Sequence, residues 1–130
     1  MNGLKIHHIG IKVSDLEKSR TLYQKLGYVE KAPPVEDLIQ NNRIQFVISA
    51  DQTLTLEFIE PLNPSSSVFG FPDGYHHICY DVSAEPVFLQ AFQRLHIGKI
   101  FTQPIIAPAI DDRKVVFALL NNKTFVEFLL

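Results

Sequence analysis

The sequence predicts an α+β fold made of two tandem βαβββ units. The nine residues "HHIGIKVSD" at 7–15 return almost unchanged as "HHICYDVSA" at 76–84. A segment with helical spacing of apolar residues follows each copy. The ends of the two halves also match, since "RIQFVISADQTLTLEF" at 43–58 aligns without a gap with "RKVVFALLNNKTFVEF" at 113–128. These repeats indicate two copies of one folding unit.

The 130 residues are predicted to form a single domain. Its repeat units span about 4–60 and about 75–130, and a linker rich in Pro, Gly and Ser covers about 61–74. A chain of this length with 46% hydrophobic residues can bury one core. Duplication for stability would explain why apolar residues recur, but it does not explain why His and Glu recur in register.

Each unit is expected to contain one helix after its first strand. In the first unit, Ser14–Glu17 is a capping-box pattern that predicts the helix start, and Gly27 is placed to end the helix. In the second unit, Pro86 lies near the first helical turn, where its missing N–H costs little. An apolar face from Phe88 to Leu95 follows, and Gly98 is expected to end this helix.

The last two strands of each unit are predicted to form a hairpin. The turns are expected at 50–52 and at 121–122, where Asn tolerates the positive φ of a tight turn. The sequence signal for the second strand of each unit is weak. Residues 28–38 and 99–110 are expected to contain this strand and a loop.

Composition and charge exclude several classes of function. The net charge is −2, and no basic run exceeds two residues, so we expect no binding to nucleic acid or to an anionic membrane. The single cysteine, Cys79, cannot form an internal disulfide, which is typical of a reducing compartment. The N-terminal residues lack the apolar core of a signal peptide, and no segment is long enough to span a membrane. We therefore expect a cytoplasmic protein.

Two histidines and two glutamates recur at matching positions of the repeat. Strand alternation places His8 and His77 on the less apolar face of the first strand of each unit, and Glu57 and Glu127 on the corresponding face of the last strand. A carboxylate within an apolar strand is costly unless it is paired or coordinated. One divalent cation would remove the repulsion between two such carboxylates. The alternative is that Glu57 lies on a solvated sheet face and Glu127 on an edge strand.

For residues near the four candidate ligands, the sequence gives weaker evidence of a role at the site. His7 and His76 are expected to face away from the candidate ligands and to pack against a helix. Cys79 shares the face of His77 and is expected to line the cavity. The apolar, proline-rich segment 104–112 would either cover the site or lie in a dimer interface.

The chain resembles the vicinal oxygen chelate superfamily, which includes glyoxalase I, methylmalonyl-CoA epimerase, extradiol dioxygenases, and the fosfomycin and bleomycin resistance proteins. The resemblance lies in "HHIGIKVSDLEKSRTLYQKLGY", "TLTLEFIEPL", "GYHHICYDV" and "RKVVFALLNNKTFVEFLL". It implies a glyoxalase-like fold, in which both units form one curled mixed sheet around one divalent metal ion (Co, Ni, Mn, Zn or Fe). The ligands implied by the family are His8, Glu57, His77 and Glu127.

Within the superfamily, "EFIEPLNPSSS" and "GYHHICYDV" most resemble methylmalonyl-CoA epimerase. This resemblance implies a metal-dependent isomerase or lyase of the glyoxalase and epimerase type. A carboxylate, Glu57 or Glu127, would transfer the proton, and the metal would stabilise an enolate or enediolate. The implied substrate is a small acyl thioester or oxo compound, and a homodimer is expected.

The sequence departs from the epimerase pattern before the third strand. Epimerases have a stretch like "PEQGV", whose glutamate is proposed as a base, whereas this chain has "LIQNN". Ile39 stands in the position of that glutamate, Gln40 is retained, and Asn41 replaces the glycine. The later "GxxGxxVxFL" pattern is present only as "PAIDDRKVVFAL", without its glycines.

Two other functions use the same fold. A non-catalytic protein that binds a small molecule such as an antibiotic is the main alternative, although such binders usually lack the complete ligand set. Iron-dependent dioxygenases typically use two His and one carboxylate, so a fourth ligand at Glu57 argues against them.

Overall fold

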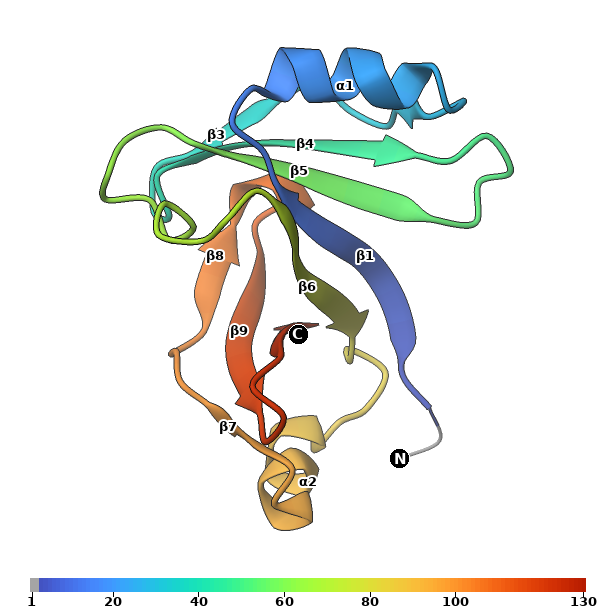
Figure 1. The fold of residues 1–130 in the computed structure, drawn as a ribbon. Helices are drawn as coiled ribbons and strands as arrows, with labels where there is room; N and C mark the ends of the chain where they lie inside the picture. The colour runs from blue at the N-terminus through green and yellow to red at the C-terminus, as the bar shows by residue number, and fades with distance from the viewer. Residues whose placement is uncertain (1–2) are drawn as a thin grey trace.

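A computed structural model describes residues 3–130, in which ten strands form one curled mixed sheet with two helices (Figure 1). The predicted α+β fold class is confirmed. Helix α1 lies over β4 and β5 at one end of the molecule, and helix α2 lies at the opposite end (Figure 1). Neither helix among the described residues is long and apolar enough to cross a membrane.

The two halves contain the same five strands and one α-helix in the same order, and the second half adds a short 3₁₀-helix. The first half consists of β1 (Lys5–Lys12), α1 (Leu16–Gln24), β2 (Val29–Glu30), β3 (Val35–Asp37), β4 (Asn42–Ile48) and β5 (Thr55–Pro61). The second consists of β6 (Gly74–Asp81), α2 (Phe88–Leu95), β7 (Gly98–Ile100), β8 (Ile105–Ala107), the 3₁₀-helix η1 (Pro108–Ile110), β9 (Arg113–Leu120) and β10 (Phe125–Leu129). The weak second strand of each unit is therefore two short strands, β2 with β3 and β7 with β8.

The sheet is nearly symmetric about its centre. Its strand order is β2-β4-β5-β1-β6-β10-β9-β7, with β3 paired to β4 and β8 paired to β9 outside this path. The central strands β1 and β6 are antiparallel, while β1 is parallel to β5 and β6 is parallel to β10. The four strands that carry the predicted metal ligands are therefore consecutive, in the order β5-β1-β6-β10.

The start of α1 differs by one residue from the expected capping box. The N-cap is Asp15, whose side chain accepts a hydrogen bond from the Lys18 N–H, and this bond satisfies a free helix donor. The Ser14 hydroxyl instead donates to Asp73 in the linker. Gly27 follows the helix with a φ of 91°, as expected for a glycine that ends a helix.

The end of α2 was predicted at the wrong residue. The helix is capped by His96, which has the left-handed conformation (φ 53°), and Gly98 is the first residue of β7. A Cβ at Gly98 would lie 2.6 Å from the Leu119 carbonyl oxygen. The glycine is therefore required for the close approach of β7 to β9, not for the helix cap.

The two hairpins lie where they were predicted, but other residues have the positive φ. Gln52 (φ 62°) and Lys123 (φ 67°) adopt it, rather than Asn121 or Asn122. The Asn122 side chain instead accepts a hydrogen bond from the Thr124 N–H, so it organises the turn through its oxygen.

The core consists of three apolar clusters. One lies under α1 and includes Leu16 and Phe58, and a second lies under α2 and includes Phe92 and Phe128. The third joins the two halves inside the curled sheet and is made of Ile44, Phe46, Ile59, Val68, Cys79, Ala107, Ile110, Val115 and Leu129. Segment 104–112 therefore contributes Ala107 and Ile110 to the core of its own chain.

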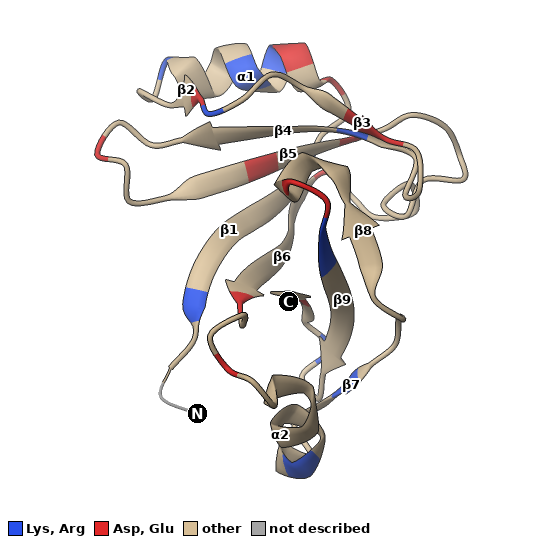
Figure 2. Ribbon diagram, turned by 180° about the vertical axis from the view of Figure 1, so that it is seen from behind, with Lys and Arg blue, Asp and Glu red and all other residues tan. Residues whose placement is uncertain are grey.

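Basic residues are spread along α1, β1, β9 and α2 instead of gathering on one face (Figure 2). Half of the acidic residues lie in strands, where Asp37, Glu57 and Glu127 are buried. Asp37 accepts hydrogen bonds within its own turn, which leaves Glu57 and Glu127 as the buried carboxylates inside the curled sheet. These two carboxylates mark the place where the fold departs from an ordinary apolar interior.

Candidate metal centre

The strand register brings Glu57 and His77 to either side of Gly10. Gly10 of β1 pairs with Glu57 of β5 and with His77 of β6. A Cβ at Gly10 would lie 2.2 Å from the His77 Cε1 atom, so the imidazole occupies the space over the glycine. The absence of a side chain at position 10 is what allows the His77 ring to lie across β1.

A second row of the sheet has the same plan. Cys79 of β6 pairs with His8 of β1 and with Glu127 of β10. Gly10 and Cys79 occupy the same position of the repeated motif, two residues after His8 and His77. Each row therefore places a small residue between an imidazole and a carboxylate from neighbouring strands.

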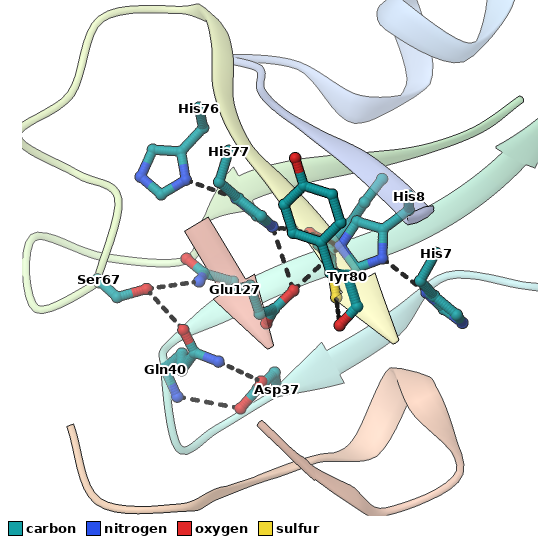
Figure 3. A network of polar contacts seen from close by, with 12 residues as sticks. His7, His8, Asp37, Gln40, Ser67, His76, His77, Tyr80 and Glu127 are labelled. Carbon is teal, nitrogen blue, oxygen red and sulfur yellow. Dashed lines mark hydrogen bonds and ion pairs between the residues drawn. The ribbon is translucent and has the colours of Figure 1, made fainter. Parts of the chain in front are cut away.

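The four predicted ligands converge on one point within a single chain. The two Nε2 atoms of His8 and His77 are 3.3 Å apart. His8 Nε2 lies 3.3 Å from Glu57 Oε1 and 3.1 Å from Glu127 Oε1, and His77 Nε2 lies 3.5 Å and 3.2 Å from the same oxygens. All four residues are buried, with exposed fractions of 5% or less. Figure 3 shows the His8 and His77 rings directed at Glu127.

This arrangement fits one divalent ion. Two ligand atoms that each lie about 2.1 Å from an ion, at tetrahedral or octahedral angles, are roughly 3.0–3.4 Å apart. The observed spacings of 3.1–3.5 Å are close to this range. Moreover, no donor among residues 3–130 forms a well-oriented hydrogen bond with the buried Glu127 Oε1. Two imidazole nitrogens and two carboxylate oxygens are donors that Zn, Mn, Fe, Co and Ni accept.

The charges in the cluster stabilise each other. Burial alone would lower the pKa of His8, but the Glu57 charge and contacts with Cys79 and Glu127 outweigh burial and raise it well above its usual value. Burial alone would raise the pKa of Glu127, but the close contacts with His77 and His8 lower it instead. In the absence of a metal, a proton on His8 therefore balances part of the carboxylate charge.

His7 and His76 were expected to face away from the candidate ligands, but both contact them. Their Nδ1 atoms lie 2.8 Å from the Nδ1 atoms of His8 and His77, respectively (Figure 3). Burial, followed by the neighbouring His77, lowers the pKa of His76 to about 4, and burial together with His8 lowers the pKa of His7. Strand alternation gave the wrong direction because the register of β1 with β6 shifts at both positions.

A cavity of about 380 Å³ adjoins the cluster. Glu57, His77 and Glu127 line it, while His8 lies behind them. Its walls are mostly apolar and come from both halves, through Ile44, Ile59, Val68, Phe71, Phe117 and Phe125. No Lys or Arg among residues 3–130 lines this cavity. The cavity can therefore hold a small, largely apolar group against the His/Glu cluster.

A polar network ties the loop before β4 to the linker at the cavity wall. The Ser67 hydroxyl donates to Gln40 Oε1 (3.1 Å) and accepts from Asn42 Nδ2 (3.0 Å). Gln40 is fixed in turn by Asp37, whose Oδ1 accepts from the Gln40 N–H (Figure 3). Gln40, Asn42 and Ser67 all line the cavity, so the network presents polar atoms to a bound molecule.

Several expectations about single residues were wrong or incomplete. Cys79 does not line the cavity. It is fully buried beside His8, and burial raises its pKa to about 12. Ile39 lines the cavity and is 58% exposed, whereas Asp37 is buried in its own turn. Asn42, Ser67, Thr102 and His76 line the cavity without having been predicted, because their sequence context resembles an ordinary loop or strand.

A family model described as "Glyoxalase/Bleomycin resistance protein/Dioxygenase superfamily" matches residues 7–117. Two curated relatives align with the chain at 28% identity over 83 residues: the mitochondrial methylmalonyl-CoA epimerase of Bos taurus and the ethylmalonyl-CoA/methylmalonyl-CoA epimerase of Cereibacter sphaeroides. Each alignment covers 60% of this chain, with 46% of the bovine protein and 60% of the bacterial one. The matched part thus spans about half the length of these relatives.

A solved structure shares the fold over nearly the whole chain. The crystal structure of methylmalonyl-CoA epimerase from Mycobacterium tuberculosis matches with a TM-score of 0.83, covering 99% of this chain and 90% of that chain at 16% identity. The family-model match contains three of the four converging residues, His8, Glu57 and His77. The chain belongs to the glyoxalase/bleomycin resistance protein/dioxygenase superfamily.

Proposed function

We propose that this chain is a metal-dependent isomerase or lyase that moves a proton at a carbon next to a carbonyl group. Its substrate would be a small acyl thioester or oxo compound. The observation that carries the proposal is the convergence of four buried His and Glu side chains beside an apolar cavity. The names of the two curated relatives, both epimerases of malonyl-CoA derivatives, support the isomerase class.

His8, Glu57, His77 and Glu127 would hold one divalent ion. When bound, the ion would supply Lewis-acid chemistry by polarising a substrate oxygen. The ion would be Co, Ni, Mn, Zn or Fe, because each of these metals binds imidazole nitrogen and carboxylate oxygen.

The proton-transfer step falls to the carboxylates of the cluster. Among the described residues that line the cavity, Glu57 and Glu127 are the only carboxylic acids. Burial raises the pKa of Glu127, but contacts with His77 and His8 outweigh burial and lower it, so the group is ionised and has a free lone pair for a proton. Delivery of a proton to the opposite face of the carbon by a second group would invert its configuration, and return of the first proton to a neighbouring atom would isomerise the substrate.

The cavity restricts the size and the surroundings of the reacting group. Its volume of about 380 Å³ lies near the lower end of the range of small-molecule sites. The apolar walls exclude water from the carboxylates, and the polar edge at Gln40, Asn42 and Ser67 can orient a substrate oxygen. Ile39 presents an apolar side chain at this wall, so it supplies no second base.

Solvent deuterium exchange tests the proposal. The metal-loaded protein is incubated in D₂O with 2-substituted acyl thioesters and hemithioacetals, and incorporation of deuterium at carbon is followed by mass spectrometry. We expect exchange by the native chain and a loss of about 10²–10⁴-fold in Glu127→Gln, which keeps a ligand oxygen but removes the base. Glu36→Gln, an exposed glutamate outside the cavity, is the matched control and should exchange normally.

A non-catalytic binding protein is the second candidate function. It is favoured by Ile39, which stands where the epimerases have a glutamate, and by the apolar cavity walls. Binding of a small molecule in the cavity without exchange of any compound in the panel would establish this function and contradict the first.

A further inference from the structure

Each candidate histidine ligand is preceded by a second histidine in the same geometry. In both pairs the two Nδ1 atoms are 2.8 Å apart. In both pairs the rings meet edge to face with centroids 5.1 Å apart. The same contact thus occurs independently in the two halves of the chain, which share it through the repeated sequence "HH".

A register shift in the sheet makes this contact possible. Along β1 and β6, Ile6 pairs with Tyr80 and His8 with Cys79, which leaves His7 as an extra residue. His76 of β6 is likewise an extra residue, because Gly10 pairs with His77 and the next residue, Ile11, pairs with Tyr75. Successive side chains of a regular strand point to opposite faces, so two adjacent imidazoles could not meet through Nδ1 without such a bulge.

Counting protons assigns the donor and the acceptor. A hydrogen bond between two Nδ1 atoms needs one proton, and a neutral imidazole has one N–H. A neutral histidine that binds a metal through Nε2 must have its proton on Nδ1. The Nε2 atoms of His8 and His77 are the ones that converge on the carboxylates. In the metal-bound protein, His8 and His77 are therefore the donors.

We propose that His7 and His76 are positioning residues that accept the Nδ1–H of His8 and His77 and hold each Nε2 lone pair toward the common metal. The inference rests on the proposed metal site and adds a role for two residues outside the ligand set. Ligand histidines that lose such a partner generally lose about 10–100-fold in metal affinity.

The two positioning residues differ in one respect that decides the experiment. The His76 ring stacks on Phe125, with centroids 5.7 Å apart, and lines the cavity. The His7 ring packs edge to face against Phe46 and does not line the cavity. Variants of His7 therefore test the positioning role without changing the wall that a substrate would contact.

The test compares His7→Asn with His7→Phe. Asn places an oxygen acceptor at the same number of bonds from Cα as Nδ1, whereas Phe keeps a ring against Phe46 but has no acceptor. The Zn²⁺ dissociation constant is measured by competition with a chromophoric chelator. We expect a weakening of about 10–100-fold in His7→Phe and near-native affinity in His7→Asn. His76→Asn and His76→Phe provide a second pair should His7→Phe fail to fold.

A long-range ¹H–¹⁵N spectrum of the Zn²⁺-loaded native protein gives a direct reading of the same property. The inference requires protonated Nδ1 and metal-bound Nε2 in both His8 and His77. Equal affinities of the native, Asn and Phe proteins would overturn the positioning role alone. A proton on Nε2 of His8 in the Zn²⁺-loaded protein would exclude that nitrogen as a ligand, and would overturn the proposed ligand set together with the positioning role. A native protein that binds no Zn²⁺ or other divalent ion would overturn the proposed metal function, and this inference with it.

Discussion

Four ionisable side chains with exposed fractions of 5% or less occupy one small volume. Burying a single unpaired carboxylate would cost several kcal/mol, so the cluster persists only because opposite charges and ligand atoms face each other. His8 supplies the balancing proton in the protein without metal, since its pKa is raised above the usual value. A metal ion would take over that balancing role, so metal and proton compete for the same nitrogen.

This competition predicts how metal affinity depends on pH. Because the pKa of His8 is raised in the metal-free protein, a metal must displace its proton, and affinity falls as pH falls. While His8 is protonated, the association constant should rise by about tenfold per pH unit. Ni²⁺ titrations by calorimetry in two buffers of different ionisation enthalpy measure both the constant and the proton released. A constant that is independent of pH, with no proton release, would contradict this assignment.

The repeat in the sequence was enough to identify the residues of the cluster. His8 and His77, like Glu57 and Glu127, occupy matching positions, and the structure brings all four together. The directions of His7 and His76 could not be predicted in the same way. Strand alternation assumes a regular ladder, and the bulges in β1 and β6 depend on pairing between distant segments.

At the scale of elements, the departures from the family pattern have a local explanation. Asn41 stands in place of a glycine and has a φ of 57°, while Asp111 and Asp112, before β9, have φ values of 53° and 59°. Asn and Asp tolerate this left-handed region better than other non-glycine residues do. The two loops that precede β4 and β9 therefore keep a glycine-like turn without glycine, which the sequence pattern alone did not reveal.

Strand β1 offers a sharp test of how the sheet positions a ligand. Gly10→Ala would place a methyl group 2.2 Å from His77 Cε1, so the imidazole must move. We expect a loss of about 1–3 kcal/mol in the free energy of unfolding and about 10-fold or more in metal affinity. Gly70→Ala is the matched control, because nothing lies within 4 Å of the added carbon there. Urea unfolding and metal titration of both variants check the prediction, which fails if they behave alike.

At the scale of the whole molecule, duplication produces a site that neither half contains. Each half supplies one imidazole and one carboxylate, and the antiparallel pairing of β1 with β6 joins the two sets. The tandem units could be predicted from the sequence because the repeat is long and in register, and the curl of the sheet was implied by the resemblance to the superfamily. The strand order could not, since it depends on contacts between residues far apart in the chain. The expected homodimer stays a prediction, which sedimentation velocity checks.

A site that joins the two halves should couple metal binding to global stability. A ligand that binds only the folded protein stabilises it by about 2.7 kcal/mol at a free concentration 100 times its dissociation constant. We expect this gain in urea unfolding of the native protein with Mn²⁺ or Zn²⁺, and its loss in His77→Ala. His96→Asn changes an exposed histidine at the end of α2 and should keep the full gain. An equal gain in His77→Ala would place the stabilising ion elsewhere.

The central claim is that one divalent ion binds at the point where β5, β1, β6 and β10 bring their side chains together. Anomalous diffraction from crystals grown with Zn²⁺ tests it most directly. The account predicts one strong peak about 2.0–2.2 Å from Nε2 of His8, Nε2 of His77 and a carboxylate oxygen each of Glu57 and Glu127. A Zn²⁺ ion bound elsewhere, with these four side chains left uncoordinated at saturating metal, would contradict it.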